Sequence, residues 1–245
     1  MFITAQVRIG HELFCCNVVK LIINKQNPAV MKVGIIGSGI VGQVLAKAFS
    51  SEGHQVKLGT RDTKKEAVVK FKEANPSITT GDFTETAAFG EWIVLATGGA
   101  VVSDAIKLAG ENNFAGKLVI DATNPIAAAP PQNGVLQFFT GPNESLMEKI
   151  QEQLPAAKLV KAFNSVGNNL MYKPNFPGGI PSMFICGNDE EAKQTVTGIL
   201  TAFGWETADM GKVESARAIE PLCILWCIPG ILKNQWTHAF KLLKL

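Results

Sequence analysis

The sequence predicts an α/β protein whose strands form a doubly wound, mostly parallel sheet, followed by a short C-terminal helical extension. Three observations in the 245-residue chain support this prediction. Short apolar runs recur along the chain, segments with helical spacing lie between them, and a glycine-rich turn follows the first run. Strands that alternate with helices pair in parallel, because each crossover helix returns the chain to the same end of the sheet. Together these features predict a fold of the Rossmann type.

The first strand, the first helix and the second strand are the clearest elements. Residues 31–36 form an apolar run that ends at glycine, as expected of a strand buried on both faces. Apolar residues then recur at helical spacing over 40–49, and Gly53 stands where a helix C′ residue is expected. Val56 and Leu58 make the second strand.

The remaining elements alternate in the same way. We expect helices at 64–74, at 189–202 and ending near 109, and strands at 77–80, 92–96, 117–121, 158–162, 183–186 and 206–210. This organisation places a nucleotide-binding domain at 31–212 and a C-terminal helical segment at 213–245. Residue 31 is a methionine that begins the first strand directly. We therefore expect 1–30 to be a poorly structured or untranslated leader, with a targeting segment as the alternative.

The turn Gly37-x-Gly39-x-x-Gly42 predicts a dinucleotide site. The first glycine of this motif permits the tight turn, the second lets the backbone approach a pyrophosphate, and the third lets helix and strand pack closely. The phosphates then lie at the helix N-terminus, where N–H groups favour anions. Since the motif follows a strand and opens a helix, its context supports this interpretation.

The end of the second strand indicates which dinucleotide binds. NAD sites place an acidic residue there for the ribose 2′-hydroxyl, whereas this chain has Thr60 and Arg61. A guanidinium grips a 2′-phosphate with two charge-assisted hydrogen bonds, a hydroxyl adds a third, and Lys64 and Lys65 reinforce the positive field. These residues predict NADP as the cofactor. In the alternative interpretation, Asp62 points inward to serve NAD and Arg61 is a solvated surface residue.

Further segments that follow strands are candidates for the site, since ligands of such sheets lie beyond the carboxyl ends of the strands. Thr97, Gly98 and Gly99 let the backbone approach the ribose or pyrophosphate, or they form an ordinary strand-to-helix turn. Asn124 orients a nicotinamide amide or caps a turn. Asn164 follows the strand at 158–162 and completes the set.

Two irregular segments, at about 124–144 and 164–182, are rich in Pro, Gly and Asn. Long loops of this kind are uncommon in a compact domain unless they are functional or disordered. Placed over the strand ends, they would wall a pocket for a second substrate. Their ring-bearing or flexible apolar residues would either face that substrate or pack within the loops; these are Phe138, Phe139, Met171, Tyr172 and Phe176.

No general acid–base pair and no metal site is evident in the sequence. None of the three histidines falls at the carboxyl end of an expected strand, and Tyr172, the only tyrosine, has no lysine four residues later. Cys223 and Cys227 share a helical face, which buried apolar cysteines explain better than a metal. Hydride passed directly between two bound cofactors requires positioning and exclusion of water more than acid–base chemistry. We therefore expect no catalytic side chain.

Composition narrows the partners and the compartment. A hydrophobic content of 47% supports a substantial core, and a net charge of +2 gives no argument for a nucleic acid or an anionic membrane as partner. Five cysteines, none in CxxC spacing, fit a reducing cytoplasm. The apolar stretch 222–232 contains Pro229 and Gly230 and is too short to span a bilayer. We expect it to be a buried helix or a contact between the subunits of a homodimer.

Four motifs, at 31–42, 58–62, 120–125 and 160–164, together resemble the coenzyme F420-dependent NADP reductase family and the related cytosolic domain of membrane ferric reductases. The resemblance covers roughly residues 31–220. It implies that Ser38, Gly39, Ile40 and Val41 hold the pyrophosphate, and that Thr60, Arg61 and Lys64 or Lys65 hold the 2′-phosphate. It also implies that a deazaflavin lies above the nicotinamide and exchanges hydride with it directly.

The sequence thus predicts an NADP-dependent oxidoreductase that transfers hydride between NADP(H) and a second planar cofactor, F420 or a flavin, or a small acceptor. Two alternatives remain open. An imine or 2-hydroxy-acid reductase of the pyrroline-carboxylate reductase type would need a long helical domain after the sheet. A non-catalytic NADP(H)-binding redox sensor would have its nicotinamide end blocked by side chains.

Overall fold

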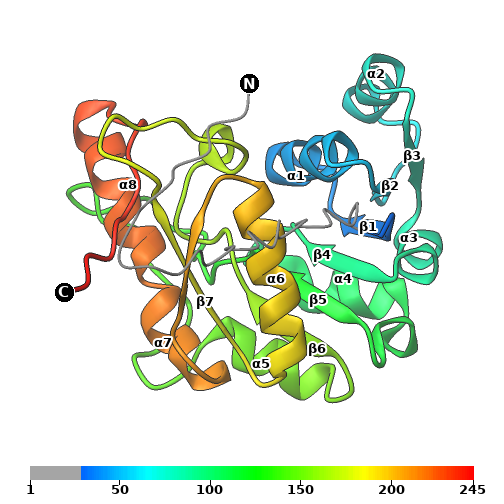
Figure 1. Cartoon of the computed structure of the whole chain (residues 1–245). Coiled ribbons are helices and arrows are strands. Elements are labelled where there is room, and N and C mark those ends of the chain that lie inside the picture. Colours follow the sequence, from blue (N-terminus) through cyan, green and yellow to red (C-terminus); the bar gives the residue numbers. More distant parts are fainter. Residues whose placement is uncertain (1–28) are drawn as a thin grey trace, which may run out of the picture.

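Eight strands form one sheet in the order β3-β2-β1-β4-β5-β6-β7-β8 (Figure 1). The computed structural model describes residues 29–245, so the expectations for the leader fall almost entirely outside the described residues. The strands are β1 Lys32–Ile36, β2 Gln55–Gly59, β3 Ile78–Gly81, β4 Trp92–Leu95, β5 Leu118–Asp121, β6 Lys158–Lys161, β7 Ser182–Gly187 and β8 Glu206–Asp209. The helices are α1 Ile40–Ser51, α2 Glu66–Ala74, α3 Phe83–Phe89, α4 Val102–Ala109, α5 Leu146–Gln153, α6 Glu190–Ala202, α7 Ala216–Ile219 and α8 Leu222–Lys233.

The first six strands pair in parallel, and β7 is antiparallel to β6 while remaining parallel to β8. The doubly wound, mostly parallel sheet predicted from the sequence is confirmed. The reversal at β7 was not predicted, and its cause is the connection that precedes it. A parallel crossover usually needs a helix to bring the chain back across the sheet. The chain from 162 to 181 holds only the short 3₁₀ turn Asn168–Leu170, so the next strand returns in the opposite direction.

Apolar side chains cover both faces of the sheet, because successive residues of a strand point to opposite sides. Val33 and Ile35 pack into a layer that includes α1 and α6, and Ile36 packs into a second layer that includes α4 and α5. This two-sided burial is why the central strands are continuous apolar runs in the sequence. In Figure 1 helix α6 crosses in front of the sheet, which places its layer towards the viewer.

Helices α3 and α5 were missed from the sequence, although both carry start signals. Asp82 and Glu85 form a reciprocal capping box at the start of α3, and the Ser145 hydroxyl accepts from the Glu148 N–H at the start of α5. These residues satisfy N–H groups that a helix leaves unpaired at its first turn. Both helices are short, so apolar periodicity has few positions in which to show itself.

The C-terminal extension is helical only as far as Lys233. The main-chain N–H of Ser182 donates to Phe240 O at 2.9 Å, so the last residues run back beside β7. Within residues 29–245 one stretch, Val213–Lys233, is long and apolar enough by length and composition to cross a membrane, and 33% of its most apolar window is buried inside the fold. This stretch holds Glu220, which is buried.

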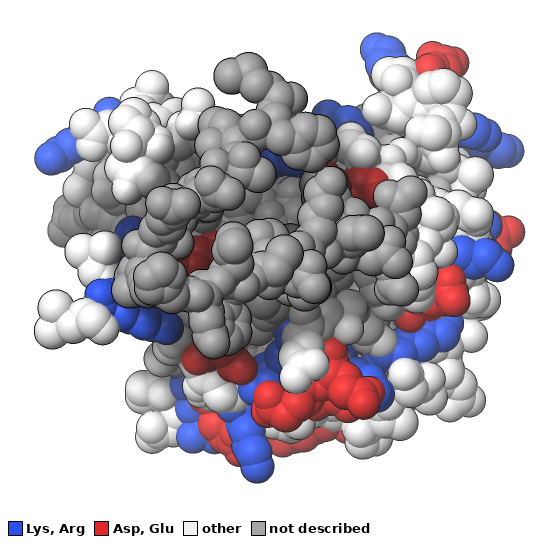
Figure 2. Space-filling model, in the orientation of Figure 1, with Lys and Arg blue, Asp and Glu red and all other residues white. Residues whose placement is uncertain are grey.

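On the face drawn in Figure 2, positive and negative side chains alternate along the lower and right edges.

Candidate dinucleotide site

The turn between β1 and α1 has the geometry of an anion cradle. Gly37 adopts φ +123°, and a Cβ atom on it would lie 2.5 Å from Ala96 O. A Cβ on Gly42 would lie 1.9 Å from Gly37 O, so only glycine allows the turn to close this tightly. A Cβ on Gly39, in contrast, would meet nothing within 4 Å. Helix α1 has no side-chain cap and no acidic residue in its first turn. The space above Gly39 and the uncapped N–H groups fit a pyrophosphate.

Substitutions at Gly39 and at Gly42 are expected to separate the effect on folding from the effect on cofactor binding. Gly39→Ala should leave the melting temperature near that of the wild type and weaken NADPH binding at least tenfold, because its methyl group enters only the open space. Gly42→Ala should also lower the melting temperature, because its methyl group meets Gly37 O. Calorimetric unfolding together with NADPH titration measures both effects. Equal loss of stability in the two variants would contradict this account.

Thr60 at the end of β2 is turned into the protein. Its side chain is buried, with the hydroxyl 3.0 Å from Ser38 Oγ and 3.3 Å from both the N and O atoms of Asp62. One donor and two acceptor positions are thereby used, which is the full capacity of a hydroxyl. In this arrangement Thr60 ties the glycine turn to the β2 loop and has no position left for a phosphate.

The loop after Thr60 is ordered by Asp62. Its Oδ1 accepts from the Lys64 N–H at 2.8 Å, so this carboxylate closes its own turn. Arg61 and Lys65 are exposed, and within residues 29–245 the guanidinium of Arg61 has no ion pair. The loop therefore presents a basic surface beside the cradle.

The ends of β4 and β5 lie against each other. A Cβ on Gly99 would lie 2.0 Å from Asn124 O, so glycine is required for this contact. Gly98 faces open space, and Thr97 Oγ1 is buried without a hydrogen-bond partner among the described residues. The sequence-predicted residues of these two strand ends are thus neighbours.

Asn124 and Asn164 form a pair across the ends of β5 and β6. Asn124 Nδ2 donates to Asn164 O at 2.8 Å, and Asn164 Nδ2 donates to Asn124 Oδ1 at 3.2 Å and to Ile219 O at 3.0 Å. The Asn164 side chain is 3% exposed, whereas Asn124 is half-buried. Asn124 is therefore the member of the pair that can meet a ligand, and Asn164 positions it.

A buried cluster of three charged residues, Asp121, Lys161 and Glu220, lies next to this pair. It was not predicted from the sequence. Lys161 Nζ lies 2.6 Å from Asp121 Oδ2 and 2.9 Å from Glu220 Oε1, and it donates to Thr123 O at 2.9 Å. Burial alone would lower the pKa of the Lys161 ammonium, but the carboxylates of Asp121 and Glu220 outweigh burial and raise it. The signal in the sequence was a charged residue at the end of each of two apolar strands.

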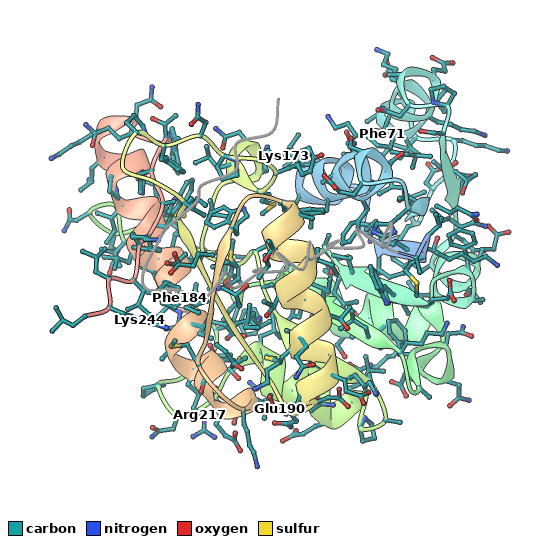
Figure 3. All side chains as sticks on the ribbon, viewed as in Figure 1. Phe71, Lys173, Phe184, Glu190, Arg217 and Lys244 are labelled. Atoms are coloured by element: carbon teal, nitrogen blue, oxygen red, sulfur yellow. The ribbon has the colours of Figure 1, made fainter. Side chains whose placement is uncertain are left out.

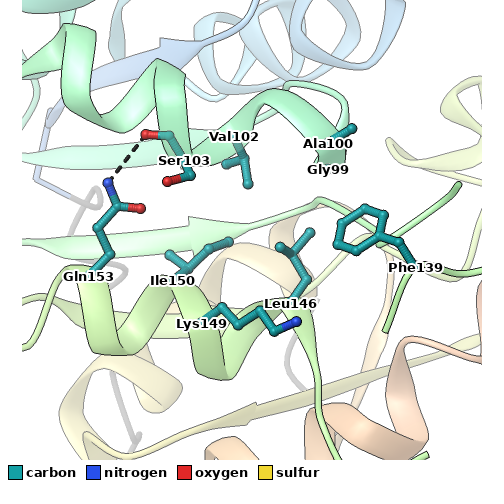
Figure 4. Close-up of a pocket in the computed structure, with 9 residues that line it drawn as sticks. All are labelled: Gly99, Ala100, Val102, Ser103, Phe139, Leu146, Lys149, Ile150 and Gln153. Atoms are coloured by element: carbon teal, nitrogen blue, oxygen red, sulfur yellow. Dashed lines mark hydrogen bonds between the residues drawn. The ribbon is translucent and has the colours of Figure 1, made fainter. Parts of the chain in front are cut away.

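An apolar pocket of about 390 Å³ lies between α4 and α5, beside Gly99 (Figure 4). Its residues are Gly99, Ala100, Val102, Ser103, Phe139, Leu146, Lys149, Ile150 and Gln153. Phe139 therefore lines a pocket, as one interpretation of the long loop predicted. Met171 and Tyr172 are not among the residues that line this pocket. Met171 is a core residue, and the Tyr172 ring packs edge-on against Phe203 while its hydroxyl donates to Glu52 Oε1 at 2.7 Å.

The described cysteines differ in burial and in the pKa of the thiol. Burial raises the pKa of the Cys186 thiol to about 12. The hydrogen bond between Cys223 and Cys227 raises the pKa of the buried Cys223 and lowers that of the half-buried Cys227. Since the thiolate is the nucleophile, we expect iodoacetamide to label Cys227 first among these three. Peptide mass spectrometry over a time course measures the order, and earlier labelling of Cys186 would contradict the prediction.

The chain is similar to a known protein family and to several known proteins. Residues 32–125 match the family described as NADP oxidoreductase, coenzyme F420-dependent. A crystal structure of an Arthrobacter sp. FB24 protein, assigned as an F420-dependent NADP reductase, is 31% identical with a TM-score of 0.81, and the match covers 87% of this chain and 100% of that one.

Two characterised proteins are also similar in sequence. F420-dependent NADP reductase of Methanocaldococcus jannaschii is 28% identical over 202 residues, which are 78% of this chain and 89% of the reductase. Rat metalloreductase STEAP3 is 33% identical over 207 residues, which are 82% of this chain but only 39% of STEAP3. The chain therefore spans about two fifths of STEAP3. An imine reductase from Aspergillus terreus, 15% identical with a TM-score of 0.59, shares the fold alone. The chain belongs to the family of coenzyme F420-dependent NADP oxidoreductases and is an NADP-dependent oxidoreductase.

Proposed function

We propose that this chain transfers hydride directly between the nicotinamide of NADP(H) and a second planar cofactor, F420 or a flavin. The observation that carries the proposal is the open cradle at Gly39 beside the exposed Arg61. The acceptor named for the relatives differs, since two are F420-dependent reductases and one is a metalloreductase. NADP is named for both F420-dependent reductases, and the cradle at Gly39 and the exposed Arg61 support its binding by this chain.

Different residues of the chain bind different parts of the cofactor. The main-chain N–H groups around Ser38, Gly39, Ile40 and Val41, at the uncapped start of α1, take the pyrophosphate. Arg61, with Lys65 behind it, takes the 2′-phosphate. Asn124 orients the nicotinamide carboxamide. Thr60 and Asn164 act indirectly, the first by ordering the turn and the second by fixing Asn124.

The apolar pocket beside Gly99 is the place proposed for the acceptor ring. Its volume of about 390 Å³ falls in the range of small-molecule sites. Leu146, Ile150 and Phe139 give it an apolar wall, and the ammonium of Lys149 lies at its rim, paired with Glu144 at 2.9 Å. When both partners are bound, the nicotinamide supplies a hydride with both bonding electrons and is oxidised, while the acceptor is reduced. No side chain has to move a proton from the nicotinamide carbon.

Anaerobic stopped-flow mixing tests this function. The protein saturated with NADPH is mixed with F420, FMN or a ferric chelate, and loss of the reduced nicotinamide absorbance near 340 nm is followed. Rapid oxidation by F420 or FMN, slowed by Phe139→Ser through the acceptor KM but not through the NADPH Kd, is the expected result. Tight NADPH binding with no oxidation by any acceptor would favour the non-catalytic sensor instead.

We further propose that the chain acts in the cytoplasm as a homodimer. The support is the apolar surface of α8, where Leu225 is 54% and Leu232 is 56% exposed. Cys186, Cys223 and Cys227 are free thiols, as in a reducing compartment. Light scattering should give twice the chain mass, and Leu225→Lys should reduce it to one chain mass. A monomeric wild-type protein would overturn the dimer.

A further inference from the structure

The buried cluster of Asp121, Lys161 and Glu220 combines two carboxylates with one ammonium. Asp121 Oδ1 accepts from the N–H and the hydroxyl of Thr123 at 2.9 and 2.7 Å, and Oδ2 contacts the Lys161 ammonium. Glu220 accepts from the main-chain N–H groups of Leu146 and Met147 at 2.9 and 3.0 Å, in addition to Lys161. The ammonium of Lys161 is the only positive charge of the cluster, and each oxygen of the two carboxylates lies within 3.0 Å of it or of an N–H or O–H group. The cluster therefore holds one more negative charge than positive charge.

This excess charge is shielded from solvent. The side chains of Asp121, Lys161 and Glu220 are 0%, 0% and 2% exposed. A charge buried in this way is screened much less by salt than a surface charge, and it acts over a longer distance. The nearby pair of Arg217 and Glu148 contributes no net charge, and Arg217 projects from α7 at the molecular surface in Figure 3.

The cluster is connected directly to the two strand ends that carry the asparagines. Lys161 Nζ donates to Thr123 O, one residue before Asn124. Ile219 O, one residue before Glu220, accepts from Asn164 Nδ2 at 3.0 Å. The negative charge thus lies below the residue that the proposed function places at the nicotinamide.

We propose that this cluster is an electrostatic device that favours the oxidised form of the bound cofactor over the reduced form. The oxidised nicotinamide ring carries a positive charge and the reduced ring carries none, so a fixed negative charge nearby stabilises only the oxidised ring. Tighter binding of NADP⁺ relative to NADPH lowers the reduction potential of the bound couple and makes bound NADPH the stronger hydride donor. The proposal rests on the proposed function, in which Asn124 meets the nicotinamide.

Calorimetric or fluorescence titration with NADP⁺ and with NADPH tests the proposal without any acceptor. Glu220→Gln and Asp121→Asn each remove the excess charge. Each should raise the ratio of the NADP⁺ Kd to the NADPH Kd by about tenfold, which for a two-electron couple corresponds to about 30 mV. Glu206, on β8, pairs with Lys241 at the surface. Glu206→Gln makes the same charge change there, so it is the matched control and should leave the ratio of the two Kd values unchanged.

The outcomes are distinct. If the variants weaken both forms of the cofactor equally, the cluster only supports the fold and the proposal is overturned. If both variants fail to fold, the test is the comparison of the NADP⁺ Kd with the NADPH Kd in the wild-type chain. Tighter binding of NADP⁺ than of NADPH supports the device, and tighter binding of NADPH contradicts it. If the wild-type chain binds neither form, it is the proposed function that fails.

Discussion

Replacing Lys161 with methionine is expected to lower the free energy of unfolding by about 3–5 kcal/mol, the range for breaking a buried ion pair. The substitution keeps the length of the apolar stem but leaves the carboxylates of Asp121 and Glu220 buried without a cation. It also removes the donor to Thr123 O, so one buried carbonyl loses its partner. Urea unfolding followed by tryptophan fluorescence measures the change.

Lys158→Met, on the same strand, is the matched control for this prediction. Its ammonium pairs with Asp189 and Glu191 at 3.3 and 3.4 Å near the surface, where such pairs contribute about 0–1 kcal/mol. The two variants should therefore differ by several-fold in their effect on stability. A Lys161→Met protein as stable as the Lys158→Met control would show that the cluster does not stabilise the ends of β5 and β6.

Replacing Arg61 with alanine is expected to raise the Kd for NADPH by roughly 10- to 100-fold and to leave the Kd for NADH unchanged. A hydrogen bond to a charged group contributes about 1.5–3 kcal/mol, and about 1.4 kcal/mol corresponds to tenfold in affinity. Only NADPH carries the 2′-phosphate that Arg61 would grip. Fluorescence titration with both nucleotides measures the discrimination.

Lys70→Ala is the control for Arg61, because it removes a nearby positive charge from α2 that pairs with Glu66 at 2.6 Å. It should change neither affinity by more than about twofold, since exposed pairs of this kind contribute little. If Arg61→Ala weakened NADH and NADPH equally, the 2′-phosphate would have to be recognised elsewhere.

The parts of the site that were predictable from the sequence are those in which a local pattern fixes the geometry. The turn at Gly37 closes because Gly42 has no Cβ to meet its carbonyl, a constraint contained within six residues. The strand ends were predictable because a strand buried on both faces is a continuous apolar run. Position in the parallel sheet then brought Gly99 against Asn124, and Asn124 against Asn164, as expected of neighbouring carboxyl ends.

The parts that were missed depend on contacts distant in sequence. A lysine near a strand end is ordinarily a surface residue, and only the approach of Glu220 from the end of α7 makes Lys161 a core residue. The inward direction of the Thr60 hydroxyl depends in the same way on Ser38 and the Asp62 main chain, which hydrogen-bond with it. Likewise, the direction of β7 depends on how the chain from 162 to 181 packs rather than on the residues of the strand.

Comparative titration of the wild-type chain with NADPH and NADH tests the central claim most directly, namely that the cradle at Gly39 and the loop at Arg61 form an NADP(H) site. The account predicts saturable binding of one nucleotide per chain, with NADPH bound at least tenfold more tightly than NADH, in line with one charge-assisted contact to the 2′-phosphate. Equal affinities, or tighter binding of NADH, would mean that Asp62 rather than Arg61 meets the ribose, and would contradict the account.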